Sequence, residues 1–347
     1  MLNILTNLRP TFADSTKYLI NGVITWYAVI ILSGALLGSL IGYFVFARRL
    51  HLDSDTLIVG LTIGLFVGIL GARLYYVLFA FKDMEINSFI DIINPRNGGL
   101  AIHGAVIAAG IFIVIYCKLK KVKLLYVLEI AMPLILLAQV VGRWGNFVNQ
   151  EAFGPLVPFT GEPVGGILSD AQLLEQREFL KHFLIPDFII DRMYIASSGA
   201  AGFTIAGYYV PTFLMESVAN LIGLTAYMII RKYWKKIYVG DGLCFYLIWY
   251  GTVRLFIEIL RTDALMIGNT GIKQNVLISA IFIVAGIALI VLRRIFKYKP
   301  ISCYEALYGK ESTMMEDDFV PPAPKIRKVK YQGSKKFQNK TAKPKED

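Results

Sequence analysis

The residues best suited to chemistry gather in one short stretch, residues 142–154. It brings the cation Arg143, the amide of Asn146 and the carboxylate of Glu151 within nine positions, directly after the apolar run 124–141. Polar groups at the edge of a membrane segment are costly unless they bind a ligand or one another. Three glycines would let the backbone turn tightly and approach a bound group. This stretch is therefore the first place to expect a functional site.

A second group of polar residues lies inside or beside other apolar runs. Arg254, Glu258 and Arg261 are spaced by four and three positions, so they share one face of a helix. The other candidates are Tyr27, Arg73, Tyr76, His103 and Glu216. Several arginines with a histidine and carboxylates favour a pocket for an anionic lipid head group, because a planar guanidinium donates two parallel hydrogen bonds to phosphate.

Each candidate also has a purely structural explanation. Arg254 and Glu258 would neutralise each other in lipid, and Arg73 could extend to the membrane interface. His103 could be a satisfied core histidine, Glu216 could cap the start of a helix, and the tyrosines suit an aromatic belt. The combination of these residues favours a binding pocket over the separate explanations.

The composition predicts a membrane protein. Of the 347 residues, 56% are hydrophobic and only 18% are charged, and several stretches of about twenty residues are long enough to cross a bilayer. The net charge of +11 would suit nucleic acid, but the cations lie beside the apolar runs or in the last fifty residues. That distribution indicates membrane topology and anionic lipid, so no nucleic-acid partner is expected. The three cysteines have no metal-site or disulfide spacing, and no metal site is predicted.

Seven apolar runs predict an all-α polytopic membrane protein with seven transmembrane helices. These runs cover residues 23–46, 57–81, 100–117, 124–141, 212–230, 243–260 and 276–292. Residues 1–21 are expected to form a surface segment and residues 22–296 the seven-helix transmembrane domain. The basic tail 297–347 lacks the apolar content to fold alone.

Residues 143–210 form the longest segment without a spanning run. Within it, residues 175–181 predict a short surface helix and residues 188–190 a short strand.

The distribution of basic residues predicts the orientation in the membrane. The first, third and fifth loops and the tail are the most basic, which places them in the cytoplasm. The N-terminus is then outside, the C-terminus inside, and residues 143–210 are extracytoplasmic. In this arrangement nearly all polar candidates lie in the outer halves of the spans. The alternative is a transporter or channel with a one-sided polar vestibule, which is disfavoured because no internal repeat is evident and the inner halves are almost uncharged.

The polar stretch and three further segments resemble the motifs of a known family. Residues 142–151, Gly-Arg-Trp-Gly-Asn-Phe-Val-Asn-Gln-Glu, resemble the signature of the prolipoprotein diacylglyceryl transferases. Residues 98–104, 211–216 and 250–258 resemble further motifs of that family, in the family's order. The likeness covers about residues 22–295 and includes weaker matches around Tyr27 and Arg73.

The resemblance implies a reaction and its substrates. The family transfers a diacylglyceryl group from phosphatidylglycerol to the thiol of the lipobox cysteine in a prolipoprotein. A thioether forms and glycerol-1-phosphate is released. The implied partners are phosphatidylglycerol, the lipobox-containing precursors and the bilayer. The implied location is the bacterial cell membrane, with the active site towards the extracytoplasmic side and without a cofactor or metal.

The resemblance also implies residue roles. Arg143 and Arg254 would hold the phosphate and stabilise charge on the leaving group. His103 would take the thiol proton, because a thiolate is the stronger nucleophile; alternatively a carboxylate is the base and His103 binds lipid. Glu258 would orient Arg254. The implied substrate-binding set is Tyr27, Arg73, Tyr76, Asn146, Glu151, Gly154, Glu216, Tyr250, Glu258 and Arg261.

The sequence departs from the family pattern in three places. Val210 and Met215 stand where many members have histidine and tyrosine, so no role is assigned to either. The outer segment 155–210 is long, and the tail after Lys297 has no counterpart. A degenerate homologue without activity is a weaker alternative, because the motif residues are intact.

Overall fold

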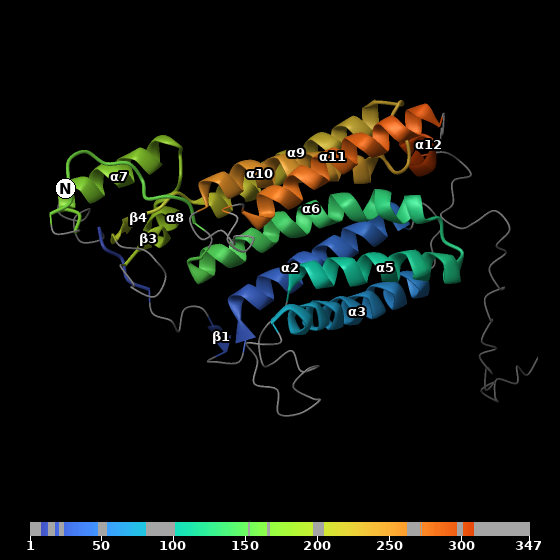
Figure 1. Cartoon of the computed structure of the whole chain (residues 1–347), viewed down its shortest axis with the longest axis horizontal. Coiled ribbons are helices and arrows are strands. Elements are labelled where there is room, and N and C mark those ends of the chain that lie inside the picture. The colour runs from blue at the N-terminus through green and yellow to red at the C-terminus, as the bar shows by residue number, and fades with distance from the viewer. Residues whose placement is uncertain are drawn as a thin grey trace, which may run out of the picture. The chain divides into compact units, whose positions relative to one another are not determined.

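Seven long helices dominate the computed structural model, which describes residues 8–12, 18–20, 24–47, 54–80, 101–151, 153–164, 167–196, 205–261, 271, 273–296 and 301–308. The long helices are α2 Trp26–Ile41, α3 Ser54–Ala80, α5 Ile102–Lys120, α6 Leu124–Asn149, α9 Thr212–Tyr233, α10 Asp241–Leu260 and α11 Gln274–Ile295 (Figure 1). Each is long and apolar enough to cross a membrane. The predicted all-helical class with seven candidate spans is confirmed.

Short elements connect or extend these helices. A π-helical turn, η2 Gly42–Ala47, continues α2. The remaining elements are β1 Tyr18–Ile20, β2 Ile24–Thr25, α7 Asp170–His182, α8 Asp187–Arg192, β3 Tyr194–Ile195, β4 Gly207–Tyr208 and α12 Cys303–Tyr308. β1 pairs with β2 and β3 pairs with β4, both antiparallel. The two sheets are minor additions to a helical protein.

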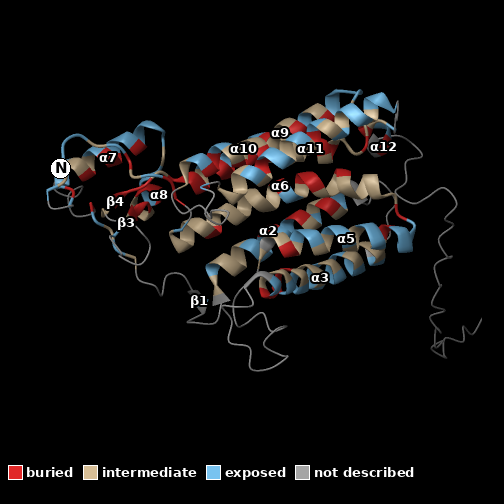
Figure 2. Ribbon diagram, in the orientation of Figure 1, coloured by how far each residue is buried: buried red, intermediate tan, exposed pale blue. Residues whose placement is uncertain are grey.

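The long helices pack through apolar and small residues while apolar side chains also cover their outer surfaces. α6 contacts α2, α9 and α10, and α10 contacts α9 and α11, whereas α3 packs mainly on α5. Many leucine and isoleucine side chains on α2, α3 and α5 are exposed (Figure 2). A surface covered with apolar side chains is stable in contact with lipid, but it is unfavourable in contact with water.

α3 and α5 approach each other at a pair of glycines. A Cβ atom built on Gly104 would overlap the carbonyl oxygen of Gly71, and the amide of Ala101 donates to the carbonyl of Ala72 at 3.1 Å. Small residues at a helix crossing let two backbones come close, which is the usual basis of helix packing in membranes. This contact fixes the start of α5, where His103 lies.

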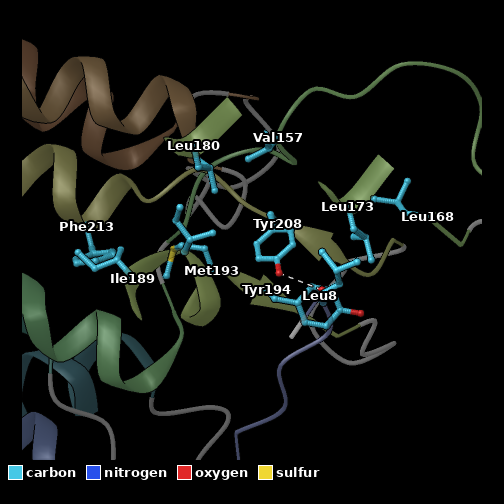
Figure 3. Close-up of a cluster of buried hydrophobic side chains, with 11 residues drawn as sticks. Leu8, Val157, Leu168, Leu173, Leu180, Ile189, Met193, Tyr194, Tyr208 and Phe213 are labelled. Carbon is cyan, nitrogen blue, oxygen red and sulfur yellow. Dashed lines mark hydrogen bonds between the residues drawn. The ribbon is translucent and has the colours of Figure 1, made fainter. Parts of the chain in front are cut away.

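The described residues between α6 and α9 (150–151, 153–164, 167–196 and 205–211) form a small folded body that we call the head segment. Its core includes Leu168, Leu173, Ile189 and Tyr208 (Figure 3). A capping box of Ser169 and Gln172 starts α7. The core continues into Trp144 and Phe147 of α6 and Phe213 of α9. The head segment is therefore attached to the ends of two spanning helices by shared packing.

Several predicted boundaries are wrong. Residues 188–190, predicted as a strand, lie in α8, because Pro186 precedes that helix and Arg177 pairs with Asp187 and Asp191 on it. The run predicted to end at 141 continues as α6 to Asn149.

The N-terminal surface segment is also not wholly superficial. Leu8 is 1% exposed, and its carbonyl accepts a hydrogen bond of 3.0 Å from the hydroxyl of Tyr208 (Figure 3). Arg9 donates to Asp170 and to the carbonyl of Leu168. Leu8 and Arg9 therefore pack against the head segment. The sequence around them contains too few apolar residues to predict that Leu8 is buried.

The first part of the predicted tail is folded. Residues 301–308 include α12, and Cys303 and Ala306 are buried against Val239. The backbone amide of Cys303 donates to the carbonyl of Ile237 at 2.8 Å. Burial raises the pKa of the Cys303 thiol, so this group is packed in its neutral form. The folded part therefore extends beyond the boundary expected at residue 296.

A buried carboxylate at the opposite end of the spans from the head segment was overlooked. Glu129 on α6 is 3% exposed and accepts from the hydroxyl of Tyr227 and from the amides of Gly240 at 3.0 Å and Gly242 at 2.8 Å. The guanidinium of Arg231 lies 3.9 Å away. The expectation that these halves of the spans are almost uncharged is wrong. The carboxylate is nevertheless enclosed by its own partners and joins α6, α9 and α10.

The glycine contact between α3 and α5 gives a matched test of packing. Gly104→Ala is expected to lower the thermal unfolding midpoint in detergent, because the new methyl group would meet the backbone of Gly71. Gly110→Ala on the same helix meets nothing within 4 Å and should leave the midpoint equal or higher, since alanine favours helix over glycine. Equal midpoints for the two variants would contradict the close crossing.

Candidate active site

The last two turns of α6 carry the polar stretch. Arg143 and Asn146 are three positions apart on this helix, and Nη1 of Arg143 donates to Oδ1 of Asn146 at 3.3 Å. Gln150 ends the helix in the left-handed conformation, at a φ of 53°. Arg143 and Asn146 therefore lie on a regular helix, which fixes the positions of their side chains relative to each other.

Two of its glycines do not form turns, contrary to the prediction. Gly142 and Gly145 are helical. A Cβ atom on Gly145 would lie 2.5 Å from the ring of Tyr27, so this glycine allows α2 and α6 to approach. Gly154 follows the helix, and its amide donates to the carbonyl of Val210 at 2.8 Å. A Cβ atom there would lie 3.0 Å from Thr212, so Gly154 lets the head segment meet the start of α9.

Glu216 on α9 joins the two central arginines. Its Oε1 accepts from Nη2 of Arg143 at 2.6 Å, and its Oε2 accepts from Nη1 of Arg254 at 3.0 Å. The carboxylate is 1% exposed and Arg254 is also buried. One buried anion therefore fixes two cations that come from different helices, α6 and α10.

A second carboxylate holds the other side of Arg254. Nη2 of Arg254 lies 2.7 Å from Oε2 of Glu258, which is fully buried. Nδ2 of Asn275 on α11 donates to Oε1 of Glu258 at 3.0 Å. Below we call Arg143, Glu216, Arg254 and Glu258 the arginine network. It connects α6, α9 and α10, and Asn275 extends it to α11.

Sequence reasoning missed Asn275 and its neighbour Lys273. Nζ of Lys273 donates to the carbonyls of Glu258 at 2.8 Å and Arg261 at 2.9 Å, where α10 ends. Cations are favourable at the C-terminus of a helix. In the sequence, the one sign of a role for Lys273 and Asn275 was their position directly before the seventh apolar run. Ordinary surface residues are equally common at such a position.

The network also extends towards solvent. Nδ2 of Asn146 donates to Oε1 of Glu151 at 3.1 Å, and Nδ2 of Asn149 donates to the same oxygen at 3.2 Å. Glu151 is exposed, whereas Asn146 and Arg143 are half-buried. Tyr27 lies close enough to Arg143 and Glu151 to interact with both charges. A path of polar groups therefore leads from the surface to the buried arginines.

Tyr250 lies beneath the arginines. It is close enough to Arg143, Glu216 and Arg254 to interact with their charges. Its ring stacks on Tyr246 with centroids 5.4 Å apart and an interplanar angle of 7°. The predicted site residues Tyr27, Arg143, Asn146, Glu151, Glu216, Tyr250, Arg254 and Glu258 are thus brought together.

Three further predicted site residues, Arg73, Tyr76 and His103, lie on α3 and α5. The guanidinium of Arg73 is buried, 5.8 Å from the ring centroid of Tyr76. His103 lies in the first turn of α5 with its ring centroid 6.1 Å from that of Tyr75. Within the described part of the chain, the hydrogen bonds and ring contacts of His103 do not reach the arginine network. Positions 98–100 of the second motif lie outside the described residues.

The geometry suits an oxyanion of a lipid head group. A guanidinium has five N–H donors, and the described contacts of Arg143 and Arg254 use only part of them. Two fixed guanidinium groups can therefore bind a phosphate without first being ordered, at the end of the apolar bundle where such a head group would lie.

Comparison with known proteins agrees with this geometry. The family model described as prolipoprotein diacylglyceryl transferase matches residues 18–292. The chain belongs to this family. It is 37% identical over 280 residues to the phosphatidylglycerol–prolipoprotein diacylglyceryl transferase of Shouchella clausii strain KSM-K16, covering 80% of this chain and 88% of the relative. It is 38% identical over 282 residues to the protein of that name from Lysinibacillus sphaericus strain C3-41, covering 81% and 92%.

The chain is also 39% identical over 280 residues to the protein of the same name from Staphylococcus aureus strain bovine RF122, covering 80% of this chain and 87% of that relative. The resemblance inferred from the motifs is confirmed. Every residue of the arginine network lies within the range matched by the family model. The chain is thus a multi-pass membrane transferase with seven candidate spans among its described residues.

Glu216→Gln should strongly destabilise the protein, because it leaves buried Arg254 and half-buried Arg143 without their shared anion. Loss of one partner from a buried ion pair costs about 3–5 kcal/mol, so the thermal midpoint in detergent should fall by several degrees. Glu178→Gln, at an exposed position on α7, is the control and should leave the midpoint unchanged. The double variant Glu216→Gln, Arg254→Gln should be less damaged than the sum of the single variants. Strict additivity would contradict coupling through Glu216.

Proposed function

We propose that this chain transfers the diacylglyceryl group of phosphatidylglycerol to the cysteine thiol of lipobox-containing prolipoproteins. The observation that carries the proposal is the pair of arginines joined by Glu216 at the end of a spanning bundle, in a chain of the prolipoprotein diacylglyceryl transferase family. The relatives' names give the same lipid donor and acceptor.

The reaction needs a nucleophile and a stabilised leaving group. The cysteine sulfur attacks the glyceryl carbon that carries the phosphate ester, so a carbon–sulfur bond forms and the carbon–oxygen bond breaks. Glycerol-1-phosphate leaves with the bonding electron pair, and a base takes the thiol proton. Arg143 and Arg254 bind the phosphate and stabilise the charge that develops on it.

The carboxylates act through the arginines. Glu216 and Glu258 hold Arg254 from two sides, at 3.0 Å and 2.7 Å, and Glu216 also holds Arg143. Guanidinium groups fixed in advance need no reorganisation when charge develops on the phosphate. Tyr27, Asn146, Glu151 and Tyr250 line the same site and contact the lipid head group or the precursor.

The residues on α3 and α5 complete the assignment. His103 takes the thiol proton, while Arg73 and Tyr76 bind lipid beside it, and Gly154 and Arg261 shape the rim. The competing assignment is a carboxylate base, for which exposed Glu151 is the candidate, with His103 binding lipid. The two assignments differ in the pH dependence that they give to a His103 variant.

The site faces the extracytoplasmic side of a bacterial cell membrane. The last turns of α5, α9 and α11 carry Lys118, Lys120, Arg231, Lys232, Arg293 and Arg294. Excess lysine and arginine marks the cytoplasmic ends of spans, and the head segment lies at the opposite end of α9. The N-terminus is then outside, the C-terminus inside, and residues 143–210 are exposed to secreted precursors.

Arg143→Ala and Arg254→Ala should each reduce transfer by at least about 100-fold, as loss of one donor to developing negative charge does in other enzymes. The assay uses purified protein, phosphatidylglycerol and a lipobox peptide, with mass spectrometry of the peptide cysteine. The matched control is Arg9→Ala, which removes an arginine that pairs with Asp170 of the head segment. This variant should remain active. Full activity of either test variant would refute the phosphate-binding role.

His103→Gln should impair transfer more at neutral than at alkaline pH if His103 is the base. A free thiol has a pKa near 8.5, so at higher pH it ionises without help and the loss should shrink. The measurement is the ratio of variant to unsubstituted kcat/KM from about pH 6.5 to 9.5. A ratio that stays constant across this range would instead support a lipid-binding His103.

A further inference from the structure

Two amide side chains, buried Asn220 and half-buried Gln139, lie one helical turn deeper than the arginine network. On α9, Asn220 is four positions after Glu216, and on α6, Gln139 is four positions before Arg143. Residues four apart lie on the same face of a helix, and one turn spans about 5.4 Å. Both amides therefore face the same inter-helix region as the arginines, but closer to the middle of the membrane.

The antiparallel packing of α6 and α9 puts these amides at one level. Arg143 contacts Glu216, and the hydroxyl of Ser217 donates to the carbonyl of Val140 at 3.0 Å. Continuing this register one turn inward places Gln139 and Asn220 at the same level. The same region is reached from α10, because Nε2 of Gln139 donates to the hydroxyl of Tyr246 at 3.0 Å.

The amides have unfilled hydrogen-bonding capacity. Asn220 is 0% exposed, and within the described residues neither its Oδ1 nor its Nδ2 has a hydrogen-bond partner; the same holds for Oε1 of Gln139. Leaving such a group unsatisfied costs about 1–3 kcal/mol, and buried polar atoms in proteins are nearly always paired. A buried asparagine in a membrane helix is therefore expected to serve a polar group that is not part of the chain.

We infer that Asn220, together with Gln139 and Tyr246, binds the ester carbonyl groups of the lipid donor. This inference rests on the proposed function and extends it to the glycerol backbone of the substrate. In a glycerophospholipid one ester-bearing carbon adjoins the carbon that carries the phosphate and the second follows it, so both carbonyls lie slightly deeper than the phosphate. The arginines would meet the phosphate, and the amide N–H and phenol O–H groups, one helical turn closer to the middle of the membrane, would meet the carbonyl oxygens.

The partial exposure of neighbouring side chains supports a route to this level. Gln139, Tyr246 and Tyr250 are half-buried, although they lie on helices in the centre of the bundle. Tyr250 is close enough to both arginines to interact with their charges, and its ring stacks on that of Tyr246. Polar groups therefore lead from the arginines through the two tyrosines to Gln139.

The test compares phosphatidylglycerol with its diether analogue, which keeps the phosphate and head group but lacks both carbonyls. Binding of each lipid to purified protein is measured by native mass spectrometry, and KM is measured for each in the transfer assay. The unsubstituted protein should bind the diester lipid about tenfold more tightly. Asn220→Leu should weaken diester binding about three- to tenfold and leave diether binding nearly unchanged, with KM rather than kcat affected.

The variants also separate binding from folding. Replacing an unsatisfied buried amide by leucine of similar size should leave the thermal midpoint equal or higher. Thr225→Leu, on the exposed side of α9, is the matched control and should change neither lipid preference nor stability. Gln139→Leu should reproduce the loss of ester preference.

Equal binding of the two lipids by the unsubstituted protein would overturn the inference while leaving the transferase proposal intact. Equal weakening of both lipids by Asn220→Leu, or a large fall in its thermal midpoint, would also overturn it, because either result indicates a structural amide. Absence of transfer to the peptide with either lipid would instead count against the transferase proposal, and the binding measurement would still decide the role of Asn220.

Discussion

The carboxylate of Glu216 is the interaction on which the rest of the site depends. Two guanidinium groups at the end of an apolar bundle repel each other, and the repulsion is poorly screened where the dielectric constant is low. Glu216 gives one oxygen to Arg143 and the other to Arg254, so a single anion compensates both. The width of the carboxylate also sets how the two cations are spaced and directed.

The same interaction links the site to the fold. Arg143, Glu216 and Arg254 come from α6, α9 and α10, and Glu258 continues to Asn275 of α11. Within the arginine network, two cations are balanced by two anions, so the site can exist in a bundle without a bound ligand. A phosphate bound as we propose would compete for guanidinium donors that are already partly used, which would favour exchange of substrate and product over permanent binding.

Much of this could be predicted from the sequence because membrane insertion acts on local composition. The seven spans follow from apolar runs alone, and the positions of Arg143, Arg254 and Glu258 next to lipid already indicated a site. The partners of these residues could not be predicted, because helix register decides that Glu216 meets both arginines. Gly142 is another example: glycine commonly ends helices, yet here α6 continues through it to pack beneath the head segment.

The two ends of α6 and α9 differ in how completely their buried polar groups are hydrogen-bonded within the chain. Glu129 is surrounded by the hydroxyl of Tyr227, two backbone amides of α10 and a guanidinium, so its lone pairs are used within the chain. Such a cluster stabilises helix packing and has little left to offer a ligand. At the other end of α6 and α9, the contacts within the described part of the chain use only some of the donors of Arg143 and none of the hydrogen-bonding atoms of the Asn220 amide. The end beside the head segment therefore keeps hydrogen-bonding capacity that a substrate can complete.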